Sequence, residues 1–166
     1  MHPEAARLIE KLRLAPHPEG GYYRETWRST LTADLPGTEG GPEGPRSFGT
    51  AIYYLLAGRD VSRLHRLKSD EIFHLYAGGP LTVHLLGDGE GYREIVMGDD
   101  LDAGQVFQAT VPAGCWFGAS LTEADAFALV GCTLAPGFDF NDFEMGGRPD
   151  LLAAFPDQDD VIRLLT

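Results

Sequence analysis

The stretch VSRLHRLKSDEIFHLYAGG, residues 61–79, combines two short alternating segments with a glycine turn. Segments 61–67 and 71–77 read as β-strands, because apolar and polar residues alternate along them. Successive side chains of a strand point to opposite faces, so one face of the first strand carries Val61, Arg63, His65 and Leu67, and one face of the second carries Glu71, Phe73 and Leu75. If these faces line the interior of the domain, His65 and Glu71 project into a largely apolar cavity.

The pattern continues on both sides of this stretch. We expect strands at 21–29, 47–57, 61–67, 71–77, 80–87, 92–97, 105–111, 115–119 and 125–134. Turns rich in Gly and Pro separate them, including a hairpin turn at Gly87-Asp88-Gly89. Many short strands with frequent turns indicate a β-sandwich or β-barrel rather than βαβ units.

The chain ends and one internal segment differ from the strand pattern. We expect an N-terminal helix within 1–15, a barrel over 21–134, and a C-terminal extension over 135–166 with two helical turns split by Pro156. The segment LPGTEGGPEGP, residues 35–45, has almost nothing to bury, which predicts a mobile loop. At 166 residues, these parts form one domain by the usual length prior.

Composition and charge exclude several classes of protein. The net charge is −12, which disfavours nucleic-acid and membrane binding as a main role, because the protein repels phosphate backbones and anionic lipid. The start MHPEAARLIEKL lacks the apolar core of a signal peptide, and the longest apolar run, 51–57, is far short of a membrane span. Two cysteines without zinc-site spacing read as reduced thiols in a cytoplasmic protein.

Four strings carry a resemblance to a known family. They are HPEGGYYRETWRS (17–29), the stretch 61–79 with its SxxHR and SDE patterns, VPAGCWFGA (111–119) and VGCTLAPGFDFNDFE (130–144). Together they resemble the cupin superfamily, in particular the Cupin_5 subgroup, long catalogued as a domain of unknown function. The resemblance implies an all-β double-stranded β-helix, or jelly-roll barrel, with short terminal helices. It also implies a homodimer and a barrel that takes a small-molecule ligand.

The resemblance also bears on metal binding. His65 and Glu71 match the first His and the Glu of the first cupin motif, but Leu67 stands at its second His position. In the second motif, Phe117 stands where a His is usual. Since two of four expected ligands are absent, we expect no cofactor and no tightly bound metal, although the His65/Glu71 pair could hold a divalent ion weakly.

His65 and Glu71 are the first candidates for catalysis. A carboxyl group in an apolar cavity tends to have a raised pKa, and a neighbouring His–Glu pair suits general acid–base chemistry. The alternative is a buried, hydrogen-bonded pair with no function. His74 and His84 alternate with apolar neighbours, which favours structural roles. His74 could enter the site only if a bulge shifted its strand.

Further candidates would bind a ligand. Tyr23, Arg24 and Arg63 could fix an anionic group, because the planar fork of arginine suits carboxylate or phosphate; the alternative for Arg24 is an exposed place on an edge strand. Trp116 and Phe117 could form a stacking wall or pack in the core. Residues 138–143, FDFNDF, read first as a packed, capped corner and second as an acidic site.

Three functions remain open at this point. The first is a metal-independent isomerase or epimerase of a sugar or sugar nucleotide, by analogy with rhamnose-pathway epimerases of the same fold. The second is a non-catalytic dimeric module that binds a small polar, anionic or sugar-like ligand. The third is a metal-dependent oxygenase or hydrolase, which Leu67 and Phe117 disfavour.

Overall fold

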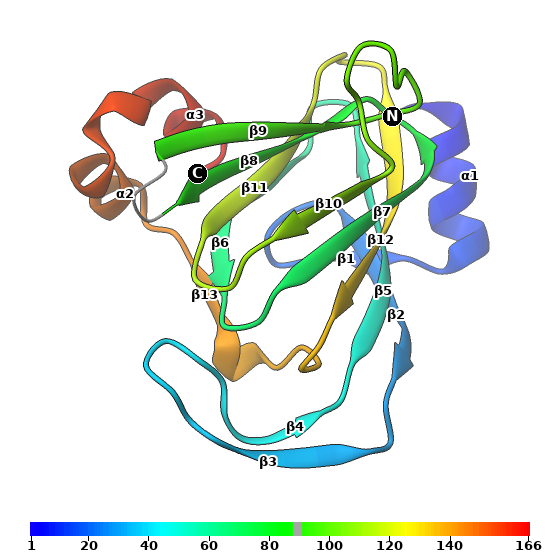
Figure 1. The fold of residues 1–166 in the computed structure, drawn as a ribbon. Coiled ribbons are helices and arrows are strands. Elements are labelled where there is room, and N and C mark those ends of the chain that lie inside the picture. Colours follow the sequence, from blue (N-terminus) through cyan, green and yellow to red (C-terminus); the bar gives the residue numbers. More distant parts are fainter. Residues whose placement is uncertain (88–90) are drawn as a thin grey trace.

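Two antiparallel sheets face each other in the computed structural model, which describes residues 1–87 and 91–166 (Figure 1). The larger sheet has the order β1 (Ala15–Pro16), β2 (Tyr22–Arg28), β5 (Thr50–Ala57), β12 (Phe127–Leu134), β7 (Glu71–Gly78) and β10 (Gln108–Val111). The smaller sheet has the order β13 (Phe143–Met145), β6 (Val61–Leu67), β11 (Trp116–Leu121), β8 (Leu81–Gly87) and β9 (Gly91–Met97). The expected all-β jelly-roll barrel is confirmed.

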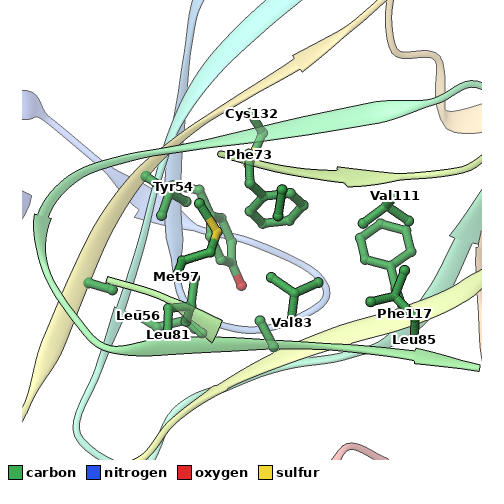
Figure 2. Packing of buried hydrophobic residues seen from close by; sticks show 14 of the residues in the cluster. Tyr54, Leu56, Phe73, Leu81, Val83, Leu85, Met97, Val111, Phe117 and Cys132 are labelled. Atoms are coloured by element: carbon green, nitrogen blue, oxygen red, sulfur yellow. The ribbon is translucent and has the colours of Figure 1, made fainter. Parts of the chain in front are cut away.

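The core lies between the sheets and consists of the inward-facing residues of both. Figure 2 shows Phe73 and Cys132 opposite Val83 and Leu85, with Phe117 beside Val111. These side chains are nine-tenths buried or more. Burial of such apolar surface is the main stabilisation of the barrel, at roughly 25 cal/mol per Å².

Helices cover the outer faces of both sheets. Helix α1 (Pro3–Leu12) packs on the larger sheet, and α2 (Arg148–Ala154), η2 (Pro156–Gln158) and α3 (Asp159–Leu164) pack on the smaller one (Figure 1). The first helix ends before the expected boundary at residue 15, because Arg13 takes a left-handed conformation (φ 53°). The Arg13 backbone N–H caps the helix by donating to the carbonyl oxygens of Ile9 and Glu10. No helix of the described residues is long and apolar enough to cross a membrane.

The segment expected to be a loop at 35–45 forms the tip of a β-ribbon, with its two ends in strands and residues 37–42 between them. Strands β3 (Thr32–Pro36) and β4 (Glu43–Ser47) pair antiparallel, with Leu35 opposite Gly44 (Figure 1). Proline is tolerated in this two-stranded ribbon because each of its strands has an edge without a partner. The loop prediction is therefore wrong for the ends of the segment, whereas its mobility stays a prediction.

The expected strands agree with the observed ones to within a few residues. The largest deviations are three residues: β10 begins at Gln108 rather than 105, and β5 begins at Thr50 rather than 47, because Ser47 still belongs to β4. Strands β8 and β9 pair antiparallel with Gly87 opposite Gly91. The hairpin turn expected at Gly87-Asp88-Gly89 lies mostly outside the described residues.

Candidate functional site

A cavity of about 500 Å³ opens between the two sheets. Strands β2, β5, β7 and β12 form one wall, and β6 and β13 form the other. Its titratable lining residues are His17, Glu19, Glu25, Arg28, His65, Glu71, Cys132, Asp139, Tyr23 and Tyr54. Leucine and phenylalanine side chains make up most of the remaining surface, so the polar groups act in an apolar setting.

A bulge in β6 decides which of its side chains enter this cavity. His65 pairs with Phe117 on β11, whereas Ser62 pairs with Ala119, so β6 carries one more residue between the two pairs. The extra residue reverses the alternation, so that Ser62 and His65 are buried while Arg63 is exposed. The expectation that Arg63 shares a face with His65 is therefore wrong.

The same bulge holds Glu19 against the barrel. The Arg63 backbone N–H donates to the Glu19 carbonyl oxygen at 2.9 Å, and the Arg63 guanidinium donates to the carbonyls of Pro18 and Glu19. The next residue, Gly20, has φ 114°, and a Cβ there would lie 2.2 Å from the Val61 carbonyl oxygen. Only glycine permits this close approach, which places the Glu19 side chain in the cavity.

Glu19 and His65 are paired in the cavity. His65 Nδ1 lies 2.7 Å from the Arg63 carbonyl oxygen, which can only accept, so Nδ1 carries a hydrogen. His65 Nε2 lies 3.2 Å from Glu19 Oε2, and two lone pairs at that distance would repel. A second hydrogen must therefore lie between Nε2 and Oε2, while Ser62 Oγ donates to Glu19 Oε1 at 2.9 Å. The Glu19 carboxylate is thus held between His65 and Ser62.

His17 lies on the other side of the Glu19 carboxylate. Its Nδ1 accepts a hydrogen bond from the Glu19 backbone N–H at 3.3 Å and lies 3.4 Å from Glu19 Oε2. Burial lowers the pKa of His17, and the nearby Glu19 charge opposes this only in part. His17 is thus neutral at pH 7, and its ring packs edge-on against Tyr23 with centroids 4.4 Å apart.

Glu71 is the second carboxyl group of the cavity and is 6% exposed. Burial raises its pKa to about 8, and the charge of nearby Glu19 adds to the shift. Its thiol neighbour Cys132, on the adjacent strand β12, opposes the shift weakly by a hydrogen bond. At pH 7, Glu71 is therefore a neutral acid that can donate a proton inside an apolar cavity.

Charged groups of β2 and the 138–143 corner complete the lining. Arg28 donates to both carboxylate oxygens of Glu25, at 3.1 and 2.7 Å, and to the Phe138 carbonyl oxygen at 3.0 Å. Asp139 caps the short helix η1 (Phe140–Asp142) by accepting from the Asn141 N–H at 2.9 Å. The corner is capped and packed as expected, and it also supplies one acidic side chain to the cavity.

Buried Asp142 anchors this corner to the ribbon. The Arg46 guanidinium, on β4, donates to both of its oxygens at 2.6 and 2.8 Å. Both side chains are less than a tenth exposed. The ion pair thus fixes the position of the segment that forms one side of the cavity.

The structure brings together Tyr23, His65 and Glu71 from the expected site residues, because all three line the cavity. The other expected residues lie elsewhere. Arg24 points to the outer face, with its guanidinium 5.7 Å from the Tyr53 ring centre, and Trp116 packs outside under Arg66.

Phe117 and His74 also lie outside the cavity lining. Phe117 packs behind His65 with centroids 4.1 Å apart and belongs to the core. His74 lies on the opposite face of β7 from Glu71, where Gln108 and Thr133 contact its ring nitrogens. The register shift of β7 against β12 falls at Tyr76, after His74, so His74 keeps the alternation that begins at Glu71 and is not turned inward.

The residues at the expected metal position do not fit a metal ion. Both ring nitrogens of His65 have other partners, the Arg63 carbonyl and Glu19. Leu67 lines the cavity where a second His would stand. In the described part of the chain, no group of three or more His, Cys, Asp or Glu side chains could hold a metal ion.

Sequence reasoning missed Glu19 and Arg28. Both lie inside the string HPEGGYYRETWRS, which carries part of the family resemblance and in which only Arg24 is an expected anion clamp. The signal for Glu19 is the Gly-Gly pair after it, since two consecutive positive-φ glycines (114° and 65°) mark a tight passage of the backbone. Arg28 faces inward because β2 shifts register between Glu25 and Trp27.

Three known proteins are similar to this chain over most of its length. An uncharacterized protein of Saccharomyces cerevisiae, YML079W, is 32% identical over 145 residues, which cover 82% of this chain and 72% of the yeast protein. A hypothetical protein from Leishmania major has 34% identity and a TM-score of 0.89, covering 100% of this chain and 99% of that one. Protein SO0799 from Shewanella oneidensis has 38% identity and a TM-score of 0.87, covering 98% and 96%.

The family pattern agrees with the fold and with these relatives. The family described as Cupin superfamily (DUF985), Cupin_5, matches residues 6–146. This range includes both sheets and all the cavity residues described above. The chain therefore belongs to the Cupin_5 family of the cupin superfamily.

Proposed function

We propose that this protein isomerises or epimerises a small, sugar-like carbonyl compound inside its barrel, by proton transfer between its own side chains. The observation that carries the proposal is the presence of two unlike groups in one cavity, Glu71 on one wall and His65 on the other. Glu71 is a neutral acid up to about pH 8, and the Glu19 carboxylate lies 3.2 Å from His65 Nε2. Titratable groups with divergent environments are typical of acid–base catalysis.

The two groups divide the work in the proposed reaction. The Glu19–His65 pair takes up the proton that leaves the carbon next to the carbonyl group. Glu71 donates to the carbonyl oxygen as negative charge develops there, which gives an enediol. The Glu19–His65 pair then returns its proton to the former carbonyl carbon, and the neighbouring hydroxyl group gives its proton back to Glu71, which yields the isomer. Each proton transfer of this kind typically contributes about 10²–10⁴ in rate.

The charge balance of the cavity favours a neutral ligand over an anionic one. Arg28 is the single Arg or Lys among the described lining residues, and Glu25 already neutralises it with two hydrogen bonds. Asp139 adds a further carboxylate. Of the expected anion-binding arginines, Arg24 and Arg63 lie outside the cavity, so hydroxyl groups of a sugar suit the lining better than a phosphate.

Hydrogen exchange tests this proposal. The protein is incubated in D₂O with a panel of aldoses, ketoses and keto sugars, and deuterium uptake at carbon is followed by mass spectrometry. We expect uptake in one class of substrate, and its loss in Glu71→Gln and Glu19→Gln. The matched control is Glu144→Gln, which removes an exposed carboxylate outside the cavity.

Two outcomes would contradict the proposal. Deuterium uptake that persists in both cavity variants would remove Glu71 and Glu19 from the reaction. Binding of a sugar in the barrel without any exchange would favour the non-catalytic ligand-binding module.

A further inference from the structure

A second chain of polar side chains lies on the outer face of the smaller sheet, away from the barrel cavity. His84 on β8 contacts Ser120 on β11 through Nε2 at 2.8 Å, and Tyr92 on β9 through Nδ1 at 2.7 Å. The Tyr92 hydroxyl in turn bonds to Glu94. None of these four residues lines the barrel cavity or takes part in the proposed isomerisation.

The hydrogen bonds in this chain have one direction. The Glu94 carboxylate only accepts, so the Tyr92 hydroxyl donates its single hydrogen to it. The oxygen of Tyr92 must then accept from His84 Nδ1–H. With its hydrogen on Nδ1, neutral His84 has a free lone pair on Nε2, and this lone pair accepts from the Ser120 hydroxyl.

His84 is held in this neutral form. It is 6% exposed, and burial lowers its pKa, an effect that Glu94 opposes only in part. The carboxylate oxygen of Glu94 lies 3.7 Å from Nδ1, close enough to stabilise the imidazolium that forms if Nε2 takes a proton. A hydroxyl, a neutral histidine and a supporting acid in this order are what an activated serine nucleophile requires.

A cleft meets this chain of side chains at Tyr92, while Ser120 and His84 are not among its lining residues. The cleft, of about 340 Å³, is bounded by Tyr92 on one side and by η2 and α3 on the other. Its wall includes Asp157, Asp159 and Asp160, so it disfavours anionic substrates. Ser120 itself is half-buried rather than enclosed.

We propose that Ser120, activated by His84, is the nucleophile of a second site, which transfers acyl groups from small neutral or cationic esters. Ser120 Oγ attacks the ester carbonyl carbon, and its proton passes to His84 Nε2. The alcohol leaves with that proton, and the acyl group remains on Ser120. Water then attacks the acyl-serine, giving up a proton through His84 and releasing the acid.

Covalent labelling of the full-length protein with a fluorophosphonate ester tests this site. We expect the label on Ser120 in peptide mass spectra, and none on that peptide in Ser120→Ala. His84→Asn should slow labelling by about 10²–10⁴-fold, since it removes the base. Tyr92→Phe keeps the ring and should slow labelling by about three- to tenfold, since it removes one hydrogen bond to His84.

The control is Ser29→Ala, which removes another half-buried serine and should label like the wild type. Three results would overturn the proposal: no label on Ser120 in the wild type, an equal loss of label in Ser29→Ala, or wild-type labelling rates in both His84→Asn and Tyr92→Phe. Barrel activity provides a separate readout, because the labelled site shares no residue with the cavity.

Discussion

The barrel cavity and the outer face of the smaller sheet each contain a buried histidine, but the two histidines are held in opposite ways. His65 faces a carbonyl oxygen and a carboxylate oxygen, so each of its ring nitrogens lies against an acceptor. His84 faces a tyrosine and a serine, so its Nε2 is left with a free lone pair. The neighbouring side chains thus decide whether a buried histidine stores a proton or accepts one.

The largest expected effect separates the cavity from the outer faces of the barrel. His65→Asn should reduce hydrogen exchange on a confirmed substrate by about 10²–10⁴-fold, because Glu19 loses its imidazole partner in the proposed proton transfer. Ligand affinity should stay within about tenfold, since Asn keeps much of the shape. The control is His74→Asn, on the outer face of β7, which should leave exchange unchanged. Wild-type exchange in His65→Asn would contradict a catalytic role.

The next prediction uses the pH dependence of stability. Glu71 keeps its proton in the folded protein up to about pH 8, but a normal carboxyl in the unfolded chain loses it near pH 4.5. The folded state therefore binds more protons between these values, and the free energy of unfolding falls as pH rises through the window. At about 1.4 kcal/mol per pH unit, the contribution of Glu71 reaches at most about 5 kcal/mol.

Guanidinium unfolding at pH 5 and pH 8 measures this contribution. Glu71→Gln should show a smaller loss of stability between the two pH values than the wild type, because Gln does not titrate. Exposed Glu144→Gln should keep the wild-type difference. If Glu71→Gln also keeps it, Glu71 is ionised in the folded protein at neutral pH.

A smaller effect distinguishes the buried corner from the surface beside it. Asp142→Ala should lower the free energy of unfolding by about 3 kcal/mol, because it leaves the Arg46 guanidinium charged and buried without its partner. Glu144→Ala breaks an exposed pair with Arg66 and should cost about 1 kcal/mol or less. Equal losses in denaturant titrations of the two variants would mean that Arg46 finds water or another partner.

The smallest expected effect compares the two faces of β2. Arg28→Ala should weaken binding of a sugar-like ligand by about three- to tenfold, the typical loss of one hydrogen bond. Arg24→Ala should leave affinity unchanged, because its guanidinium lies over Tyr53 on the outer face. Isothermal titration calorimetry of both variants with the same ligand gives the ratio of their dissociation constants. A larger loss of affinity in Arg24→Ala than in Arg28→Ala would contradict the assignment of the two faces of β2.

The strand series and the place of His65 and Glu71 could be predicted from the sequence, because both depend on local patterns. The alternation of apolar and polar residues predicted that Glu71 and Phe73 of β7 face the interior and that His74 faces the other side, as observed. The same rule failed at Arg63, since nothing in VSRLHRL marks the extra residue of a bulge. Bulges depend on the partner strand, which a single segment does not reveal.

The partners of His65 could not be predicted from spacing. The sequence suggested Glu71, six residues along, but the carboxylate within 3.2 Å is that of Glu19, which is 46 positions before it in the chain. That contact arises because the Gly20-Gly21 turn lets the N-terminal segment pass against β6. Likewise, the chain from His84 to Glu94 follows from the register of three strands, although His84 alone looked structural.

The protonation state of Glu71 is the most direct test of the proposed acid–base site. Infrared difference spectra of the wild type against Glu71→Gln isolate the carbonyl stretch of this one carboxyl group. We predict the band of a protonated carboxylic acid at pH 7, replaced by a carboxylate band as pH rises through about 8. A carboxylate band already present at pH 7 would contradict the account, because the cavity would then lack its proton donor.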